Sequence, residues 1–128
     1  MGRFLLDIHV FLWLIQGDPQ LSGQVRSIIA DDTNQLNFSV VSIWEVVIKL
    51  NIGKLKIEHS IEDIYQLLAQ LKFSILPIER LDLDRYLTLP LHHRDPFDRL
   101  IISQAIDREL ILISADGSFD LYPVQRLW

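Results

Sequence analysis

The sequence predicts an α/β fold: a single three-layer α/β/α domain whose central parallel sheet has four to five strands. Short apolar segments alternate along the chain with longer amphipathic segments, which is the order expected of parallel strands joined by helices. The chain has 128 residues, 49% of them hydrophobic. This length and composition fit one domain over residues 1–128 with one sizeable core.

The first quarter of the chain is predicted to supply two strands and two helices. Arg3–Leu6 is an apolar first strand, and Ile8–Gln16 follows it as a short helix. A second helix is expected over Pro19–Ala30, because Asp18 suits the N-cap position and proline suits the first helical position. Gln35–Phe38 is the second strand.

Two helices in the middle of the chain are predicted from their start signals. Ser39 can cap a helix over Val40–Asn51, and Gly53 can close it. Ser60–Asp63 has the residues of a capped helix start and opens an amphipathic helix that runs to Leu71.

The last part of the chain is predicted to complete the sheet. Phe73–Ile78 is the third strand and Leu81–Leu87 a short helix. The Asp-Pro pair at 95–96 starts a helix that runs to about Arg108. Glu109–Ser114 is the fourth strand, and Pro123–Leu127 is a short fifth one.

The composition excludes several classes of protein. The chain has no cysteine, which excludes disulfides, thiolate zinc sites and a cysteine nucleophile. Its longest apolar run, Val10–Ile15, is too short to span a bilayer, and the start of the chain lacks a secretory leader. We therefore expect a cytoplasmic protein without membrane contact. The net charge of −5 argues against a general polyanion binder, unless the acids gather in a cleft that holds cations.

Four carboxylates stand out by position. Asp7 directly follows the first strand and Asp116 the fourth, so both should project into one crevice if these strands are central. Asp98 lies in the first turn of its helix, with Asp95 one turn before it. Glu45 interrupts a helix that is apolar nearly all round, so we expect it to be largely buried. Carboxylate ligands without cysteine favour Mg²⁺ or Mn²⁺, and such ions activate water for attack on a phosphodiester.

Each acid also has a purely structural alternative. Asp7 and Asp116 fit turn positions. Glu45 fits an i, i+4 ion pair with Lys49 on a solvent-facing stripe. Asp95 fits a helix cap before proline, and the helix dipole that favours it there also favours its neighbour in the first turn. The case for a metal site therefore rests on the set of acids and not on any one of them.

Four motifs, in the same order and spacing, carry a resemblance to a known family. They are Leu5–Val10, Ser42–Lys49, Leu89–Ile101 and Leu112–Asp116. With them the chain resembles, over nearly its whole length, the PIN-domain nucleases and among these the VapC-type toxins of toxin–antitoxin pairs. The resemblance implies a parallel sheet with helices on both sides and an acidic Mg²⁺ site.

The resemblance also implies roles for individual residues. Asp7, Glu45 and Asp98 match the family's core metal-site acids, which are its catalytic residues. Asp116 matches the fourth, more variable position, and Asp95 lies beside the third. These five acids are therefore the implied ligands of Mg²⁺ or Mn²⁺.

Two positions near the implied site compare differently with the family. Ile8 stands where the family usually has Thr or Ser, so no hydroxyl contact to the metal is implied there. Ser114 stands where Ser or Thr is typical and is implied to orient Asp116.

The family is commonly homodimeric, cuts RNA and is blocked by a small antitoxin protein. The resemblance thus implies a Mg²⁺-dependent endoribonuclease of a type II toxin–antitoxin system.

Basic residues near these motifs are candidate substrate contacts. Arg94 and Arg99 flank the acidic helix start and are placed to touch RNA phosphates, with plain solvated charge as the alternative. Lys49 follows the buried glutamate by one turn and either holds that carboxylate or meets RNA. Lys54 and Lys56 are expected in a solvated loop.

Other conspicuous side chains favour structural roles. His92 and His93 are adjacent and point in different directions, so a surface or helix-start role is favoured over metal ligation. Trp13 and Trp44 fall on apolar helix faces and are expected in core or dimer contacts, not as platforms for stacked bases.

Other functions stay open at the level of the sequence. A non-toxin PIN nuclease shares the same acids, whereas a silent module that binds RNA or protein is expected to have lost some of them. A haloacid-type phosphatase needs a second aspartate two residues after the first, where this chain has His9. A receiver domain needs paired acids ahead of its phospho-acceptor strand and a lysine after a late strand, and both are missing.

Overall fold

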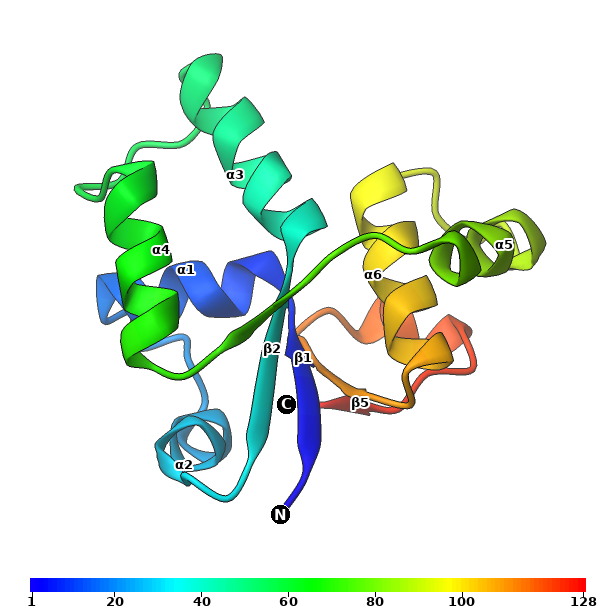
Figure 1. Ribbon diagram of the computed structural model, residues 1–128, viewed down its shortest axis with the longest axis horizontal. Coiled ribbons are helices and arrows are strands. Elements are labelled where there is room, and N and C mark those ends of the chain that lie inside the picture. Colours follow the sequence, from blue (N-terminus) through cyan, green and yellow to red (C-terminus); the bar gives the residue numbers. More distant parts are fainter.

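The central sheet has five strands, all parallel, in the spatial order β3-β2-β1-β4-β5. A computed structural model describes residues 1–128 (Figure 1). The strands are β1 (Arg3–Leu6), β2 (Gln35–Ser39), β3 (Ser74–Leu76), β4 (Ile111–Ile113) and β5 (Arg126–Leu127). The predicted α/β class and its parallel sheet are therefore confirmed.

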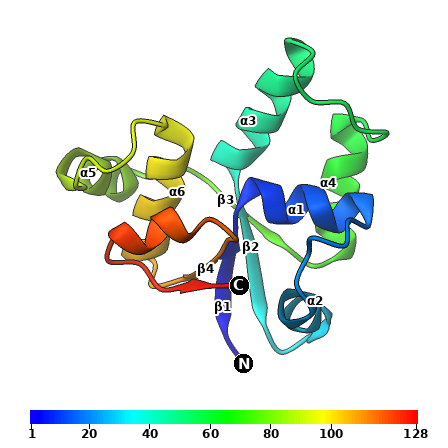
Figure 2. The ribbon, with the colours of Figure 1, turned by 180° about the vertical axis from the view of Figure 1, so that it is seen from behind.

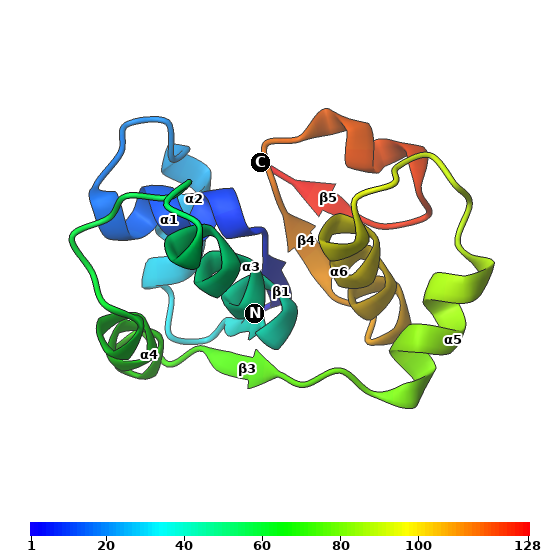
Figure 3. The ribbon, with the colours of Figure 1, turned by 90° about the horizontal axis from the view of Figure 1, so that it is seen from above.

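Helices cover both faces of this sheet, so the three predicted layers are present. The helices are α1 (Ile8–Gln16), α2 (Gly23–Ala30), α3 (Val40–Asn51), α4 (Ile61–Gln70), α5 (Arg80–Thr88), α6 (Pro96–Asp107) and the 3₁₀ helix η1 (Gly117–Leu121). The view from above in Figure 3 separates α1, α2, α3 and α4 from α5, α6 and η1. No helix has both the length and the apolar character needed to cross a membrane.

Strand β1 supplies side chains to two separate cores, because successive residues of a strand point to opposite faces of the sheet. Phe4 and Leu6 pack with residues of α1, α2, α3 and α4. Leu5 packs on the other face with residues of α6 and η1. Burial on both faces is typical of a parallel sheet. It makes β1 a rigid support for the residue that follows it.

Local capping explains why α3 and α4 begin where the sequence predicts. The Ser39 hydroxyl accepts a hydrogen bond from the Val41 backbone N–H at 3.1 Å, at the start of α3. At the start of α4, the Ser60 hydroxyl accepts from the Asp63 backbone N–H at 3.1 Å, and the Asp63 carboxylate accepts from the Ser60 N–H at 2.9 Å. Such caps satisfy the amides that a helix start leaves unpaired.

Helix α2 begins later than predicted, because Asp18 caps a turn and not a helix. The Asp18 carboxylate accepts from the Gln20 backbone N–H at 2.8 Å. The helix cap is Ser22, whose hydroxyl accepts from the Val25 N–H at 3.2 Å. An Asp-Pro pair suits a turn as well as a helix start. Here it forms a turn, because Ser22 caps the helix instead.

Three strands are shorter than predicted, for local reasons in two cases. Strand β3 ends before Pro77, which has no N–H to give to a neighbouring strand. Strand β4 begins only at Ile111, because Glu109 turns the chain at the end of α6 with a φ of 53°. Strand β5 is limited to Arg126–Leu127.

The strand order reverses between β1 and β4, which lie side by side at the middle of the sheet (Figure 2). Leu6 is in register with Phe38 of β2 and with Ile113 of β4. The next residues along the two central strands, Asp7 and Ser114, therefore lie at one level beyond the sheet. Ligand sites of open α/β sheets are found at such a reversal, beyond the carboxyl ends of the strands.

Candidate active site

Asp7 lies at the carboxyl end of the central strand β1 and is 4% exposed. Its backbone N–H donates to the Ile113 carbonyl oxygen at 3.0 Å, which extends the β1–β4 pairing past the end of the strand. Asp7 occupies the N-cap position of α1, yet its side chain makes no capping hydrogen bond. A turn or cap role therefore does not account for this carboxylate.

The two oxygens of the Asp7 carboxylate differ in their surroundings. The Ser114 hydroxyl donates to Oδ2 at 2.8 Å. Oδ1 is buried without a hydrogen-bond partner, and Nδ1 of His9 lies 4.0 Å from it. Burial raises the pKa of Asp7, and the hydrogen bond from Ser114 opposes this only in part. A buried oxygen without a partner is costly unless a ligand satisfies it.

Asp116 shares a pocket with Asp7, as expected for acids that follow the two central strands. The pocket has a volume of about 260 Å³ and is lined by Asp7, His9, Trp13, Ala115 and Asp116. Oδ1 of Asp116 accepts from the Ser118 backbone N–H at 3.0 Å and from the Ser118 hydroxyl at 2.5 Å, which lowers the pKa of Asp116. A larger pocket of about 520 Å³ beside residues 56–59 holds neither carboxylate.

Glu45 is both buried and ion-paired, so features of the two interpretations that the sequence left open occur together. It is 8% exposed, as the apolar helix around it predicts. It is also paired with Lys49, whose Nζ lies 2.9 Å from Oε2. Lys49 thus balances the charge of a carboxylate that burial would otherwise penalise. A cation that binds here has to compete with Lys49 for the same oxygen.

Asp95 and Asp98 stand together at the start of α6. Oδ1 of Asp95 accepts from the backbone N–H groups of Phe97 at 2.8 Å and Asp98 at 3.2 Å, so its predicted capping role is confirmed. Asp98 is half-buried, and its pKa is raised to about 7, first by burial and then by the charges of the four other acids. The negative charges of acids from separate elements therefore all act on the Asp98 carboxylate.

These acids gather at one end of the sheet without forming a ready-made metal site. No three His, Asp or Glu side chains are positioned to hold an ion, so the expected convergence of their oxygens is not met. Lys49 occupies one oxygen of Glu45, and Ser118 bonds only to Oδ1 of Asp116. The donor set still fits a hard divalent cation, because it consists of carboxylates and includes the unpartnered oxygen of Asp7. Binding an ion requires some of these side chains to rotate.

Without divalent cations, the folded protein should lose stability as the pH rises through neutrality. Asp98 has a pKa of about 7 in the folded protein against an ordinary value of 3.8, so the folded state holds this proton more tightly than the unfolded chain does. The free energy of unfolding therefore falls as the pH rises from about 4 to about 7. Thermal unfolding in EDTA between about pH 5 and pH 8 should show this fall, and show it reduced in Asp98→Asn. An equally steep fall in the variant would contradict the assignment.

Arg99 is buried, which corrects the expectation that it touches substrate and also the alternative of a solvated charge. Its exposed fraction is 5%. The guanidinium donates to the backbone carbonyl oxygens of Tyr86, Leu89, Pro90 and His93 at distances between 2.9 and 3.4 Å. It also lies 4.8 Å from the centre of the Tyr86 ring. Arg99 therefore fastens the segment that leads into α6.

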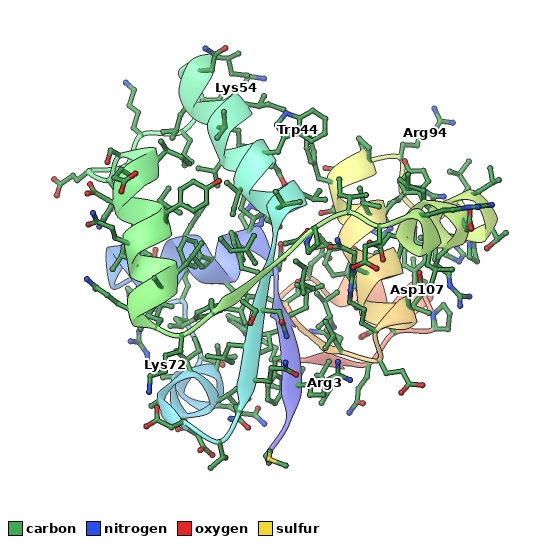
Figure 4. All side chains as sticks on the ribbon, viewed as in Figure 1. Arg3, Trp44, Lys54, Lys72, Arg94 and Asp107 are labelled. Atoms are coloured by element: carbon green, nitrogen blue, oxygen red, sulfur yellow. The ribbon has the colours of Figure 1, made fainter.

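The remaining basic candidates are exposed. Arg94 extends outward beside the start of α6 in Figure 4, and it is exposed to solvent. Lys54 lies at the far end of α3, and both Lys54 and Lys56 are exposed as expected of a solvated loop. Of these residues, only Arg94 is on the same segment as the acids of α6.

The two tryptophans differ from each other. Trp13 is half-buried and packs against Trp128, with ring centroids 5.6 Å apart, which agrees with a core role. Trp44 is 56% exposed, so of its two expected roles the core position is wrong and the dimer contact stays a prediction. Its ring meets Phe97 edge-on at 5.2 Å and so connects α3 with the start of α6 (Figure 4).

Two side chains beside the acids, His93 and Ser118, were not predicted from the sequence to lie at this site. His93, expected on the surface or at a helix start, is half-buried, and its ring lies within hydrogen-bond distance of Tyr122 and Ser118. Ser118 itself has a local signal, because a serine two residues after an aspartate often bonds to it in a turn. No local signal indicates that His93 meets a serine 25 positions later.

Comparisons with known proteins agree with the fold described above. A family model described as the PIN domain matches residues 4–124. No curated protein matches the sequence significantly. Among solved structures, VapBC2 from Rickettsia felis, bound to a DNA fragment from its promoter, aligns with a TM-score of 0.74 and 16% identity over 98% of this chain and 97% of that one. VapBC-1 from nontypeable Haemophilus influenzae gives 0.70 and 18% over 98% and 96%, and a toxin–antitoxin complex from Klebsiella pneumoniae gives 0.66 and 18% over the same shares. At these identities the similarity is one of fold.

Proposed function

The chain belongs to the PIN domain family, and we propose that it is a metal-dependent endoribonuclease that acts in the cytoplasm as the toxin of a type II toxin–antitoxin pair. Its catalytic and metal-binding residues are then Asp7, Glu45, Asp98 and Asp116, with Asp95 as a further ligand. The cation is Mg²⁺ or Mn²⁺, and the substrate is RNA.

One observation carries this proposal: a buried carboxylate with a free oxygen at the reversal of the strand order. Oδ1 of Asp7 lacks a hydrogen-bond partner, and Asp116 lines the same pocket. Burial and, after it, the charges of the other acids raise the pKa of Asp98, so these acids are close enough to repel it. A divalent cation satisfies the free oxygen and removes the repulsion, so one ligand accounts for both features.

The residues of the site have different roles in the proposed reaction. The carboxylates hold the cation, which when bound activates water and stabilises negative charge on the phosphate. Ser114 keeps Asp7 in one orientation through its 2.8 Å hydrogen bond. Lys49 neutralises Glu45 in the absence of the ion. When a cation takes its place, Lys49 is free to meet an RNA phosphate, as the exposed Arg94 already is.

Two protein partners belong to the proposal, a second copy of the chain and a small antitoxin. The structural similarity to a toxin–antitoxin complex supports the antitoxin. Uncovered apolar side chains on and after α3 support a protein contact there, since soluble monomers seldom expose such groups together. These side chains are Trp44, Val47 and Ile52, which are 56%, 42% and 56% exposed.

The purified protein, freed of antitoxin, should cut RNA only in the presence of Mg²⁺ or Mn²⁺. The test incubates it with total RNA with and without the cation and maps the new ends, and light scattering on the same preparation tests the dimer. Cleavage that persists in EDTA would contradict metal dependence. Binding of RNA without cleavage at saturating Mg²⁺ would replace the nuclease with a silent binding module.

A further inference from the structure

A chain of hydrogen bonds connects the segment before α6 to the two acids of the pocket. The His93 ring lies 2.8 Å from the Ser118 hydroxyl through Nε2. The Ser118 hydroxyl donates to Oδ1 of Asp116 at 2.5 Å. The Asp116 backbone N–H donates to the Ser114 hydroxyl at 3.0 Å, and that hydroxyl donates to Asp7. The two carboxylates thus share one hydrogen-bonded framework with a histidine from another segment.

The direction of each hydrogen bond in this chain follows from the donors available. The Ser118 hydroxyl has one hydrogen and gives it to a carboxylate, which only accepts, so it must accept the Nε2–H of His93. Nδ1 of His93 is then an acceptor, and the hydroxyl of Tyr122 donates to it at 3.0 Å. The Tyr122 oxygen in turn accepts the His93 backbone N–H at 2.7 Å. One ring tautomer, with its proton on Nε2, satisfies every group.

The framework fixes which oxygen of Asp116 is available. Both hydrogen bonds from Ser118 go to Oδ1. Oδ2 receives no hydrogen bond from the protein, and Asp116 lines the pocket with Asp7. Without His93, the Ser118 hydroxyl loses its donor on one side and is free to rotate away from the carboxylate.

The same histidine also belongs to the segment that carries the acids of α6. Asp95 follows His93 by two positions, and Arg99 holds the carbonyl oxygen of His93 and of three earlier residues of the segment. Tyr122, which anchors His93 from the other side, is 3% exposed. His93 therefore joins two rigidly held parts, the start of α6 and the turn after β4.

We propose that His93 is a positioning residue for the cation site: through Ser118 it holds the Asp116 carboxylate with one oxygen open to the pocket and fixes that carboxylate relative to the start of α6. The inference rests on the proposed function, since it gives Asp116 the role of a metal ligand. Groups that orient metal ligands through hydrogen bonds have measurable effects on metal affinity. A histidine that only fastens a loop affects stability and leaves metal affinity unchanged.

The test measures Mn²⁺ binding by calorimetry alongside the melting temperature. His93→Ala should weaken Mn²⁺ binding about tenfold, the lower end of the range for residues that orient ligands. His93→Gln retains an amide donor for Ser118 and should bind Mn²⁺ more tightly than His93→Ala. His92→Gln is the matched control, because His92 is exposed and its ring makes no hydrogen bond. It should bind Mn²⁺ like the wild type.

A double variant tests the route through Ser118. If His93 acts through this hydroxyl, His93→Ala should have no further effect on Mn²⁺ affinity in a Ser118→Ala background. Fully additive effects would overturn that route. Nitrogen-15 spectra of the wild-type histidine rings need no variant, and they should show His93 with its proton on Nε2. A proton on Nδ1 instead would overturn the hydrogen-bond chain.

The outcomes separate this inference from the function on which it rests. A wild-type protein that does not bind Mn²⁺ would overturn the proposed function. A wild type that binds Mn²⁺, together with a folded His93→Ala variant that binds it equally well, would overturn the positioning role alone. A lower melting temperature with unchanged Mn²⁺ affinity would make His93 a loop fastener only.

Discussion

Replacing Asp7 with asparagine should lower metal-dependent RNA cleavage by at least about a hundredfold, because even residues that only orient metal ligands cost about 10- to 100-fold. Asparagine has nearly the same shape, and its oxygen can still accept the Ser114 hydroxyl that now bonds to Asp7 at 2.8 Å. The loss should therefore come from the missing charge and not from altered packing. The rate of RNA cleavage at saturating Mg²⁺ measures it.

The same substitution should leave the metal-free protein as stable as the wild type or more stable. Burial raises the pKa of Asp7, so the ionised carboxylate costs free energy in the folded state at neutral pH and above. Asparagine removes this cost and also one of the charges that repel Asp98. In EDTA at about pH 8 the melting temperature of Asp7→Asn should equal or exceed that of the wild type. Added Mg²⁺ should raise the melting temperature of the wild type only.

Asp32→Asn is the control for this pair of measurements. Asp32 is exposed in the turn between α2 and β2, at the opposite end of the sheet, and makes no hydrogen bond through its side chain. Its substitution should change neither cleavage nor stability. Full metal-dependent cleavage by Asp7→Asn would show that the site is wrongly assigned. A variant that melts well below the wild type in EDTA would make Asp7 a structural residue.

The features that the sequence predicted correctly have local causes. Helix α3 begins after Ser39 because a serine satisfies the amides at its start, and β1 is a short apolar strand because it is buried on both faces. Asp7 and Glu45 were found in the same way. One ends the apolar strand, the other interrupts an apolar helix, and a charge in such a setting is visible without a structure.

The features that were missed depend on partners far away in the sequence. Ser114 bonds to Asp7 across 107 positions, and this contact exists only because β1 and β4 are neighbours in one register. The actual orientation of the carboxylates is equally non-local. Lys49 could be foreseen as a partner of Glu45 and Ser118 as a partner of Asp116, but the contact of His93 with Ser118 could not. The sequence therefore predicts which acids gather better than how they point.

Arg99 is the clearest case of this limit, and it leads to the second large effect. Arg99→Met should lower the free energy of unfolding by roughly 2–4 kcal/mol, because each buried carbonyl left without a donor costs about 1–3 kcal/mol and some of the four regain water. Methionine keeps much of the side-chain volume, so the loss should reflect the missing donors. Urea denaturation of the metal-free protein measures it, and RNA affinity should change only as far as the fold does.

Arg94→Met is the matched control, since it makes the same substitution five positions earlier on the exposed side of the same segment. Arg94 has no protein partner for its guanidinium, so its loss should leave stability within about 0.5 kcal/mol of the wild type. It should instead weaken RNA binding, more so at low salt, because a phosphate contact is electrostatic. If Arg99→Met were stable and bound RNA poorly, the expectation drawn from the sequence would be restored. Opposite effects of the two substitutions on stability and on RNA binding would show that burial, and not charge, decides which arginine can reach a substrate.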